Sequence, residues 1–417
     1  MSDRKKQLNI IQINGSFGFS NSTGRTTKEM HEWFCAHGIN SYCFISSFND
    51  DSQENARVKL YGDAKSFKIH ALFSRIFGLQ GYFSGSDTDA LIKQMDERKP
   101  DIVILRVLHN NSIHFPKLFK YLSKHKIATV IVLHDCFFFT GHCTYFTQYK
   151  CKKWQTTCGN CPAIHHDNVS WFFDMSFKCF CDKKKWFHSI HRLAVVGVSE
   201  WITNESKKSL LKEAHIIQRV YNWVDLDLFR PKNGSSIKTK YKISENQKVI
   251  LGVATVWSES KGFSTIIHTA KQIEDALVIL VGQLLEGAKD ISNNVKIIGK
   301  VTNPEILAEY YSMADVFLNP TRQETFGKTT AEAISCGTPV VAYRTTACVE
   351  LINNKRGKLV DYQDQDGFVS AVKEVLKCGK EKYCSDLRAF AEANFNKEKN
   401  MEAYMNIFYR LQSEVRR

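Results

Sequence analysis

The 417-residue sequence predicts an α/β protein whose parallel sheets are divided between two domains. A chain of this length is long for one hydrophobic core and suits two domains of about two hundred residues each. Short apolar runs rich in β-branched residues alternate with helical patterns, which is typical of successive βαβ units. Residues 314–343 contain one such unit: a strand at 316–318, a helix ended by Gly337 and Pro339, and a strand at 340–343.

Composition and charge limit the partners of the protein. Hydrophobic residues make up 43% of the chain and charged residues 24%, which are the values of a globular protein. The net charge is +14, and residues 1–230 hold most of the excess, with 31 Lys and Arg against 21 Asp and Glu. This bias favours an anionic partner such as nucleic acid, an acidic membrane surface or a phosphorylated acceptor. An ordinary soluble surface with a basic bias is the alternative.

The chain lacks the apolar segments of a membrane-spanning or secreted protein. No run approaches the roughly eighteen apolar residues of a spanning helix, and the charged start leads directly into a strand. We therefore expect a cytoplasmic protein that can rest on the inner face of the cytoplasmic membrane. In that compartment the 13 cysteines are expected to be free thiols or metal ligands rather than disulfides.

The first half opens with a predicted strand at 8–14, a loop rich in glycine and serine, and a helix at 26–36. Strand, loop and helix in this order suit a phosphate group. The loop lacks the G-x-G-x-x-G spacing, which disfavours a dehydrogenase. Residues 49–100 show no clear pattern apart from a helix at 67–77 and a turn at 81–89.

Two apolar runs, at 101–105 and 129–133, predict two further parallel strands. The second run ends at His134 and Asp135, and the carboxyl ends of such strands are where open α/β sheets bind ligands. The residues alone leave open whether His134 is functional or a structural histidine at a strand end. Another strand is predicted at 193–198.

Four cysteines follow within 19 residues: Cys143, Cys151, Cys158 and Cys161. They predict a cysteine-rich insert at about 136–175. Four thiolates could hold a tetrahedral zinc with no open position, so the metal would be structural. The alternative is a set of partly buried thiols that pack as small hydrophobes.

Residues 177–190 interleave aromatic residues with lysines. Three consecutive lysines at 183–185, beside Trp186 and Phe187, would suit an anionic lipid surface. An amphipathic helix with a solvated lysine face explains the same pattern equally well.

The second half follows a polar, turn-rich linker predicted at 231–247. Strands are predicted at 248–256, 277–281 and 295–298. A last helix, from about 397, carries apolar residues at helical spacing.

Two carboxylates lie within the βαβ unit, Glu324 in the loop after its first strand and Glu332 in its helix. Thr325 to Lys328 lead into that helix, so backbone N–H groups and the positive end of the helix dipole lie at the ligand-binding edge. A diphosphate would fit there. The alternative is one capping glutamate and one surface glutamate.

The stretch from Glu324 to Ala342 resembles the E-x7-E signature of retaining glycosyltransferases of family 4, with its Phe-Gly pair and Gly-x-Pro turn. The first half resembles polysaccharide-assembling bacterial members of that family. The similar motifs there are Ser-Thr-Gly-Arg at 22–25, His-Asp-Cys at 134–136, and the cysteine-rich stretch that follows.

This resemblance implies the GT-B fold, in which two Rossmann-like domains face a central cleft. The acceptor-binding domain would occupy residues 1–230 and the nucleotide-sugar domain residues 248–396. The helix at 397–417 would cross back to the first domain.

The resemblance also implies roles for individual residues. Glu324 and His134 would lie beside the donor sugar as the catalytic residues. The other donor contacts would be Lys261 on the diphosphate, Val301 on the nucleobase, Glu332 on the ribose, and Phe326, Gly327 and Lys328 at the helix start. Gly24 and Arg25 would face the acceptor. Family members place an arginine near the lysine, and this sequence lacks it there.

The expected function is retaining transfer of a sugar from a UDP or GDP sugar to a saccharide carried on a lipid diphosphate, in bacterial O-antigen or capsule synthesis. No cofactor is expected for catalysis, and no nucleic acid as a partner. One alternative is a zinc-knuckle nucleic-acid-binding protein, which would bind with a steep salt dependence. The other binds a nucleotide sugar without turnover, and hydrolysis of the donor would exclude it.

Overall fold

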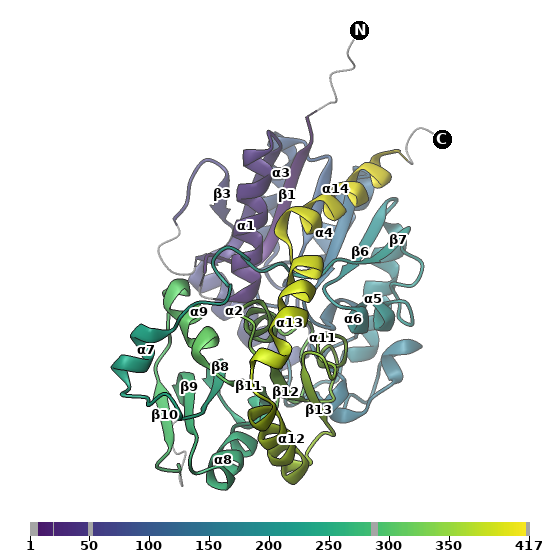
Figure 1. Cartoon of the computed structure of the whole chain (residues 1–417). Helices are drawn as coiled ribbons and strands as arrows, with labels where there is room; N and C mark the ends of the chain where they lie inside the picture. Colours follow the sequence, from purple (N-terminus) through teal and green to yellow (C-terminus); the bar gives the residue numbers. More distant parts are fainter. Residues whose placement is uncertain (1–6, 20, 49–52, 285–290, 414–417) are drawn as a thin grey trace. The chain divides into compact units, whose positions relative to one another are not determined.

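The computed structural model describes residues 7–19, 21–48, 53–284 and 291–413. Contacts divide the chain into two compact units, Met1–Val220 with Met401–Arg417, and Tyr221–Asn400. Each unit has one sheet in which every pair of neighbouring strands is parallel (Figure 1). The predicted α/β class with two parallel sheets is confirmed.

The first unit contains a seven-stranded sheet in the order β3-β2-β1-β4-β5-β6-β7. The strands are β1 (Asn9–Phe17), β2 (Asn40–Phe48), β3 (Val58–Leu60), β4 (Ile102–Leu105), β5 (Ala128–Leu133), β6 (Leu193–Gly197) and β7 (Ile216–Arg219). Strands β4, β5 and β6 are buried at every position, which explains their continuous apolar sequences. Strand β2 was not predicted because three serines interrupt its apolar pattern.

Helices connect these strands. They are α1 (Ser22–Ala36), α2 (Ala64–Phe77), α3 (Gly85–Arg98), α4 (Phe115–Lys124), α5 (Ser176–Ser189) and α6 (Glu200–Ser206), with short 3₁₀ turns η1 (Phe137–Phe139), η2 (Thr147–Tyr149) and η3 (Lys153–Gln155) in the cysteine-rich segment. The turn predicted at 81–89 is wrong in part, because helix α3 begins at Gly85. Buried Thr88, Leu91 and Met95 face the core at helical spacing.

The last helix, α14 (Lys397–Ser413), joins the first unit from Met401 onward. It buries an apolar stripe that includes Tyr404 and Phe408, and the Phe408 ring lies 6.0 Å from the ring of Phe34. Gln412 donates a hydrogen bond of 3.0 Å to the carbonyl of Asp101 beside β4. The C-terminal helix is therefore part of the core of the first unit.

The second unit contains a six-stranded sheet in the order β10-β9-β8-β11-β12-β13. Its strands are β8 (Val249–Trp257), β9 (Leu277–Leu284), β10 (Val295–Ile298), β11 (Val316–Asn319), β12 (Val340–Tyr343) and β13 (Gly357–Val360). Its helices are α7 (Ser235–Lys240), α8 (Phe263–Gln272), α9 (Pro304–Met313), α10 (Lys328–Ser335), α11 (Cys348–Leu351), α12 (Gln365–Cys378) and α13 (Glu381–Asn394), with the 3₁₀ turn η4 (Glu259–Lys261).

The segment predicted as a linker, 231–247, lies inside the second unit, which begins at Tyr221. Helix α7 forms within it and buries Ile237. The hydroxyl of Tyr241 lies 2.9 Å from that of Tyr310 on α9. These contacts tie the polar segment to the unit, although its composition is that of a loop.

Each sheet reverses its strand order beside its first strand. Strand β2 pairs with one edge of β1 and β4 pairs with the other. In the second sheet β9 and β11 flank β8 in the same way. Ligands of open α/β sheets bind at the carboxyl ends of the strands that flank such a reversal. A ligand-binding site is therefore expected in the loops after β1, β4, β8 and β11.

His70 of α2 is fully buried and is held as a neutral imidazole. The Gly81 N–H donates to its Nε2 at 3.1 Å, so Nδ1 carries the proton and donates to Ser84 Oγ at 2.6 Å. Burial, with a smaller contribution from His114, lowers the pKa of His70 from 6.5 to about 4. Its contribution to stability is complete above pH 6.5 and is lost as the pH falls toward 4.

We predict that His70→Gln removes part of the acid sensitivity of the first unit. Between pH 7.5 and 4 the free energy of unfolding of the wild type should fall by up to about 3 kcal/mol more than that of the variant. Urea unfolding of both proteins at the two pH values measures this difference. A stability gap that stays constant with pH would contradict a neutral buried His70.

Candidate functional site

The carboxyl end of β8 leads into η4, which presents Lys261 to Glu324 in the loop after β11. Lys261 Nζ lies 2.7 Å from Glu324 Oε1, and their side chains are 40% and 18% exposed. The negative charge of Glu324, opposed by burial, raises the pKa of Lys261. The lysine is therefore charged at neutral pH and remains open to solvent at the reversal of the sheet. A charged lysine in this position can bind a phosphate group.

The loops that carry this pair are fixed to one another. Gly262 has a φ of +71°, and a Cβ there would lie 2.1 Å from the carbonyl oxygen of Pro320, so only glycine fits. The Arg322 N–H and the Thr321 hydroxyl both donate to the carbonyl of Ser260, at 3.0 and 3.2 Å. The ammonium group of Lys261 is thus held beside the loop after β11.

The main chain of Glu324 is held by the loop after β12. Its N–H donates to Thr346 Oγ1 at 2.7 Å, and its carbonyl accepts from the Ala347 N–H at 3.2 Å. Both backbone groups of the glutamate are therefore paired within the unit. This leaves the side chain as the part available to a ligand.

Glu332 lies on α10 and is only 4% exposed. The hydroxyl of Tyr311, on α9, donates to Glu332 Oε2 at 3.1 Å. Helix α10 begins after Gly327, which has a φ of +86° at the N-cap position. The two glutamates of the predicted motif thus differ: Glu324 is partly open to solvent, and Glu332 is buried with a hydroxyl partner.

Two predicted donor contacts have partners inside the unit. The ring of Phe326 is 4% exposed and packs 5.8 Å from Tyr221 and 5.7 Å from Phe395. Lys328 Nζ donates to the carbonyl of Trp223. Their side chains support the loop. Val301, in the loop after β10, is half-buried.

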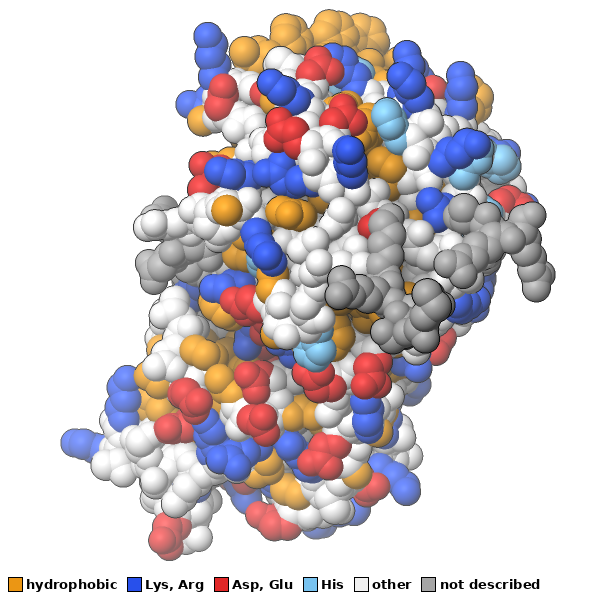
Figure 2. All heavy atoms as spheres, turned by 90° about the horizontal axis from the view of Figure 1, so that it is seen from above, with side chains coloured by type: hydrophobic (Ala, Val, Ile, Leu, Met, Phe, Trp, Pro, Cys, Tyr) orange, Lys and Arg blue, Asp and Glu red, His pale blue; other side chains and the backbone are white. Residues whose placement is uncertain are grey.

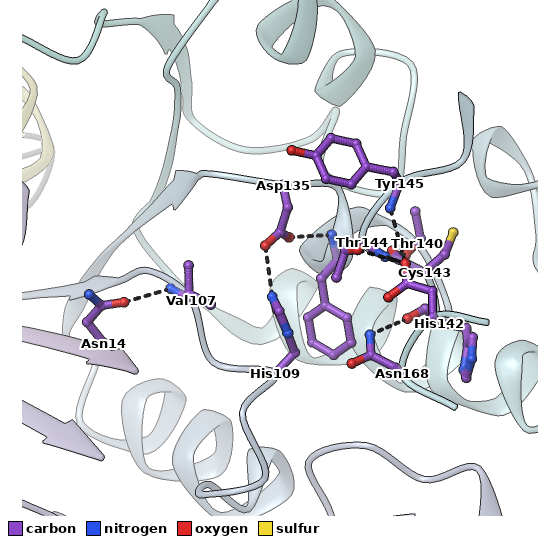
Figure 3. Close-up of polar contacts among 12 residues, drawn as sticks. Asn14, Val107, His109, Asp135, Thr140, His142, Cys143, Thr144, Tyr145 and Asn168 are labelled. Carbon is purple, nitrogen blue, oxygen red and sulfur yellow. Dashed lines mark hydrogen bonds and ion pairs between the residues drawn. The ribbon is translucent and has the colours of Figure 1, made fainter. Parts of the chain in front are cut away.

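The first unit has its own polar cluster at the reversal of its sheet, beside the ends of β1, β4 and β5 (Figure 3). His109 and Asp135 point toward one another, with Nε2 2.8 Å from Oδ2. The other carboxylate oxygen accepts from the Phe137 N–H at 2.8 Å. Asn14 accepts from the Val107 N–H at 3.2 Å and so joins strand β1 to the loop after β4.

The contact between His109 and Asp135 shifts the pKa of both groups. Burial alone would lower the pKa of His109, but the charge and hydrogen bond of Asp135 outweigh it and raise the pKa. Burial would likewise raise the pKa of Asp135, but His109 and the Phe137 N–H lower it. The sequence analysis missed His109. A histidine in the loop after β4, next to a histidine and an aspartate after β5, was the available signal.

His134 lies beside Asp135 in sequence, but its pKa is shifted in the opposite direction to that of His109. Its Nε2 lies 3.1 Å from Nη1 of Arg106, a buried arginine that also donates to Thr26. A guanidinium only donates, so Nε2 accepts and Nδ1 carries the proton. Burial, followed by the charge of Arg106, lowers the pKa of His134 to about 3. Neighbouring groups with such different pKa values are common at functional sites.

The predicted acceptor residues Gly24 and Arg25 lie in the first turn of α1. The Gly24 N–H donates to Asn21 Oδ1 at 2.7 Å, and a Cβ at Gly24 would lie 3.0 Å from Ser16 Oγ. Arg25 forms an ion pair of 2.9 Å with Glu29. Gly24 therefore shapes the turn, and Arg25 has an acidic partner one helical turn away.

The four cysteines of the predicted zinc site, Cys143, Cys151, Cys158 and Cys161, line one small pocket together with His142. Burial raises the pKa of Cys143, Cys158 and Cys161, which favours thiols. In the part of the chain that the structure describes, no group of three or more His, Cys, Asp or Glu is arranged to hold a metal ion. The structure thus gathers the four thiols of the prediction around one pocket.

The distribution of charge on one face gives no support to the nucleic-acid-binding alternative. On the face seen in Figure 2, lysine and arginine side chains are interspersed with acidic ones. Nucleic-acid-binding proteins gather their basic residues into a patch or stripe.

Residues 247–378 match the family model described as glycosyl transferases group 1. N-acetyl-α-D-glucosaminyl L-malate synthase from Bacillus anthracis is 27% identical over 52% of this chain. A D-inositol 3-phosphate glycosyltransferase from Mycobacteroides abscessus is 26% identical over 38% of it. The matched region spans 59% and 39% of those two relatives.

Solved structures resemble the whole chain. Sucrose-phosphate synthase from Thermosynechococcus elongatus has a TM-score of 0.71 at 15% identity, covering 97% of this chain and 100% of that one. HepE from Anabaena, solved with UDP, has a TM-score of 0.66 at 14% identity, covering 96% and 99%. The protein therefore has the GT-B fold of glycosyltransferases, and its second unit carries a segment that matches glycosyl transferases group 1.

Proposed function

We propose that this protein is a retaining glycosyltransferase of family 4 that moves a sugar from a nucleotide sugar to a saccharide acceptor. The observation that carries the proposal is the Lys261–Glu324 pair at the strand-order reversal of the second sheet, where the chain continues from Glu324 into α10, the helix that carries Glu332. Residues 261, 324 and 332 all fall within the segment that matches glycosyl transferases group 1.

In this proposal Lys261 and the start of α10 stabilise the departing nucleoside diphosphate. Their positive charge lies where negative charge develops in the transition state, so the reaction does not depend on a metal ion. Glu324 keeps Lys261 protonated and in place. Because Glu324 is engaged with the lysine, we assign it to orienting the donor sugar rather than to forming a covalent intermediate. The acceptor would attack from the face that the leaving group vacates.

Glu332 would bind the ribose of the nucleotide. A carboxylate accepts hydrogen bonds from ribose hydroxyls, and Tyr311 holds one of its oxygens in place. Structures of HepE with UDP and with UDP-glucose share this fold and support a nucleotide-sugar donor. We assign the base contacts to backbone groups near Val301.

The first unit would supply the acceptor side. Neutral His134 has a donor at Nδ1, and His109, whose pKa is raised by Asp135, is the neighbouring group that would face a phosphorylated acceptor. Relatives include a processive diacylglycerol α-glucosyltransferase and a protein of the cps region of Klebsiella pneumoniae. These names support a saccharide acceptor on a lipid, in surface polysaccharide synthesis.

We predict that Lys261→Met lowers transfer by about ten- to a hundredfold, because it removes a charge-assisted hydrogen bond worth about 1.5–3 kcal/mol. Sugar transfer and donor hydrolysis in the absence of acceptor are the measurements. Lys248→Met is a matched control, since Lys248 forms a similarly exposed ion pair with Asp315 at 3.1 Å, away from the proposed site. Transfer at the wild-type rate by Lys261→Met would place the diphosphate elsewhere.

We predict that substitution of Glu332 affects nucleotide binding, whereas substitution of Glu324 affects turnover. Glu332→Gln should weaken nucleotide binding by roughly tenfold or more, because it removes a carboxylate that accepts ribose hydrogen bonds. Glu324→Gln should lower turnover while nucleotide affinity stays near that of the wild type. Calorimetry with the nucleoside diphosphate and transfer assays test this, with Glu374→Gln on α12 as the control. Wild-type affinity in Glu332→Gln would refute its assignment to the ribose.

We also propose a structural zinc on Cys143, Cys151, Cys158 and Cys161, which the gathering of four thiols around one pocket supports. Binding would require the thiols to lose their protons and draw together. Metal analysis of untagged protein should find one zinc per chain, and Cys158→Ser should lose it, while Cys378→Ser on α12 should retain it. Active protein without metal would leave the thiols as packing groups.

A further inference from the structure

Helix α2 buries its small and polar residues and exposes its large apolar ones. His70, Ala71 and Ser74 face the unit. The exposed side chains are Phe67, Ile69, Leu72, Phe73 and Phe77, each between 39% and 46% exposed. A surface helix of a soluble protein normally has the opposite arrangement, with its apolar stripe toward the core.

A second exposed aromatic segment lies against the end of this helix. Trp171, Phe172 and Phe173 are 47%, 72% and 51% exposed. The Trp171 N–H donates to the carbonyl of Arg75 at 2.6 Å, and the rings of Phe77 and Phe173 stack with centroids 6.2 Å apart. We call these eight exposed residues of α2 and of the 171–173 loop, which are joined through the Phe77–Phe173 contact, the aromatic surface. Apolar patches of this kind mark interaction sites.

The charges on helix α2 itself are all positive. Helix α2 carries exposed Lys65, Lys68 and Arg75 and no acidic residue. The acidic residues beside it are engaged: Asp63 and Asp174 accept backbone N–H bonds, and Asp87 accepts from the Ser66 hydroxyl. A second copy of the chain seated on this surface would bring the same cations together, which is unfavourable. Anionic headgroups are a complementary partner.

We infer that the aromatic surface docks the protein on an anionic phospholipid bilayer. The large side chains of α2 and of the 171–173 loop enter the boundary between headgroups and acyl chains, and the cations of α2 lie against lipid phosphates. In the described ranges no helix combines the length and the apolar character needed to cross a bilayer, so the contact is with the membrane surface.

This inference moves the lipid contact away from the segment that the sequence suggested. Lys183 is buried, with Nζ donating to the carbonyls of Phe137 and Thr140 at 2.5 and 2.9 Å. Phe187 is also buried. The cations of the docking surface come from α2 instead. The inference goes beyond the transfer reaction proposed above and does not depend on it.

Co-sedimentation of the full chain with vesicles tests the inference. The wild type should bind vesicles of phosphatidylcholine mixed with an equal amount of phosphatidylglycerol at least tenfold more strongly than vesicles of phosphatidylcholine alone. Phe172→Ser with Phe173→Ser should reduce binding to the mixed vesicles by at least tenfold. Ile306→Ser, on an exposed apolar residue of α9, should leave binding unchanged.

Two double variants test whether the lysines of α2 contribute to vesicle binding. Lys65→Glu with Lys68→Glu should weaken binding to mixed vesicles, and Lys238→Glu with Lys240→Glu, which makes the same charge change on α7, should not. Equal loss in both double variants, or no vesicle binding by the wild type, would overturn the inference. So would a wild-type dimer in solution that Phe172→Ser with Phe173→Ser converts to a monomer. Nucleotide affinity should stay at the wild-type value in every variant, which separates this result from failure of the proposed transfer function.

Discussion

Parallel strand pairing is the constraint on which both candidate sites depend. A parallel sheet aligns the carboxyl ends of its strands along one edge, and the reversal of strand order separates two neighbouring loops there. In the second unit these loops bring Lys261 to Glu324, although 63 residues separate them in sequence. In the first unit Asn14, a residue of β1, accepts a hydrogen bond from the N–H of Val107 in the loop after β4. His109 in that loop contacts Asp135, which follows β5.

Burial at these edges fixes the charge of the polar groups. Glu324 raises the pKa of Lys261, and Asp135 does the same for His109, so each cation is maintained by an adjacent carboxylate. His134 has a guanidinium instead of a carboxylate as its neighbour, and it stays neutral. The two histidines at adjacent strand ends therefore have pKa values shifted in opposite directions.

The aromatic surface shows how the first unit can be stable with a helix whose apolar residues face outward. The core is supplied by fully buried strands and by the apolar stripe of α14, so α2 is not needed to complete it. Helix α2 is attached through small residues and through the hydrogen bonds of His70. Its large side chains remain available for a partner.

The local sequence pattern was sufficient to predict the buried strands and to identify the glutamate motif. Strands β10 and β12 begin and end at the predicted residues. In β12 the reason is burial, because a strand covered on both faces is apolar at every position. Strand β2 was not predicted because its serines resemble loop sequence. Helix α3 was not predicted because it begins with Gly-Ser-Asp, which is also typical of loops. Their fold is decided by the neighbours against which they pack.

The residue types of the candidate site could be read from the sequence, and their partners could not. Glu324, Glu332 and Lys261 were identified by motif, but only the tertiary structure pairs Lys261 with Glu324 and Glu332 with Tyr311. The same packing turns Phe326 and Lys328 inward. Partners, burial and protonation depend on segments distant in the chain, and spacing along the sequence contains no information about those distances.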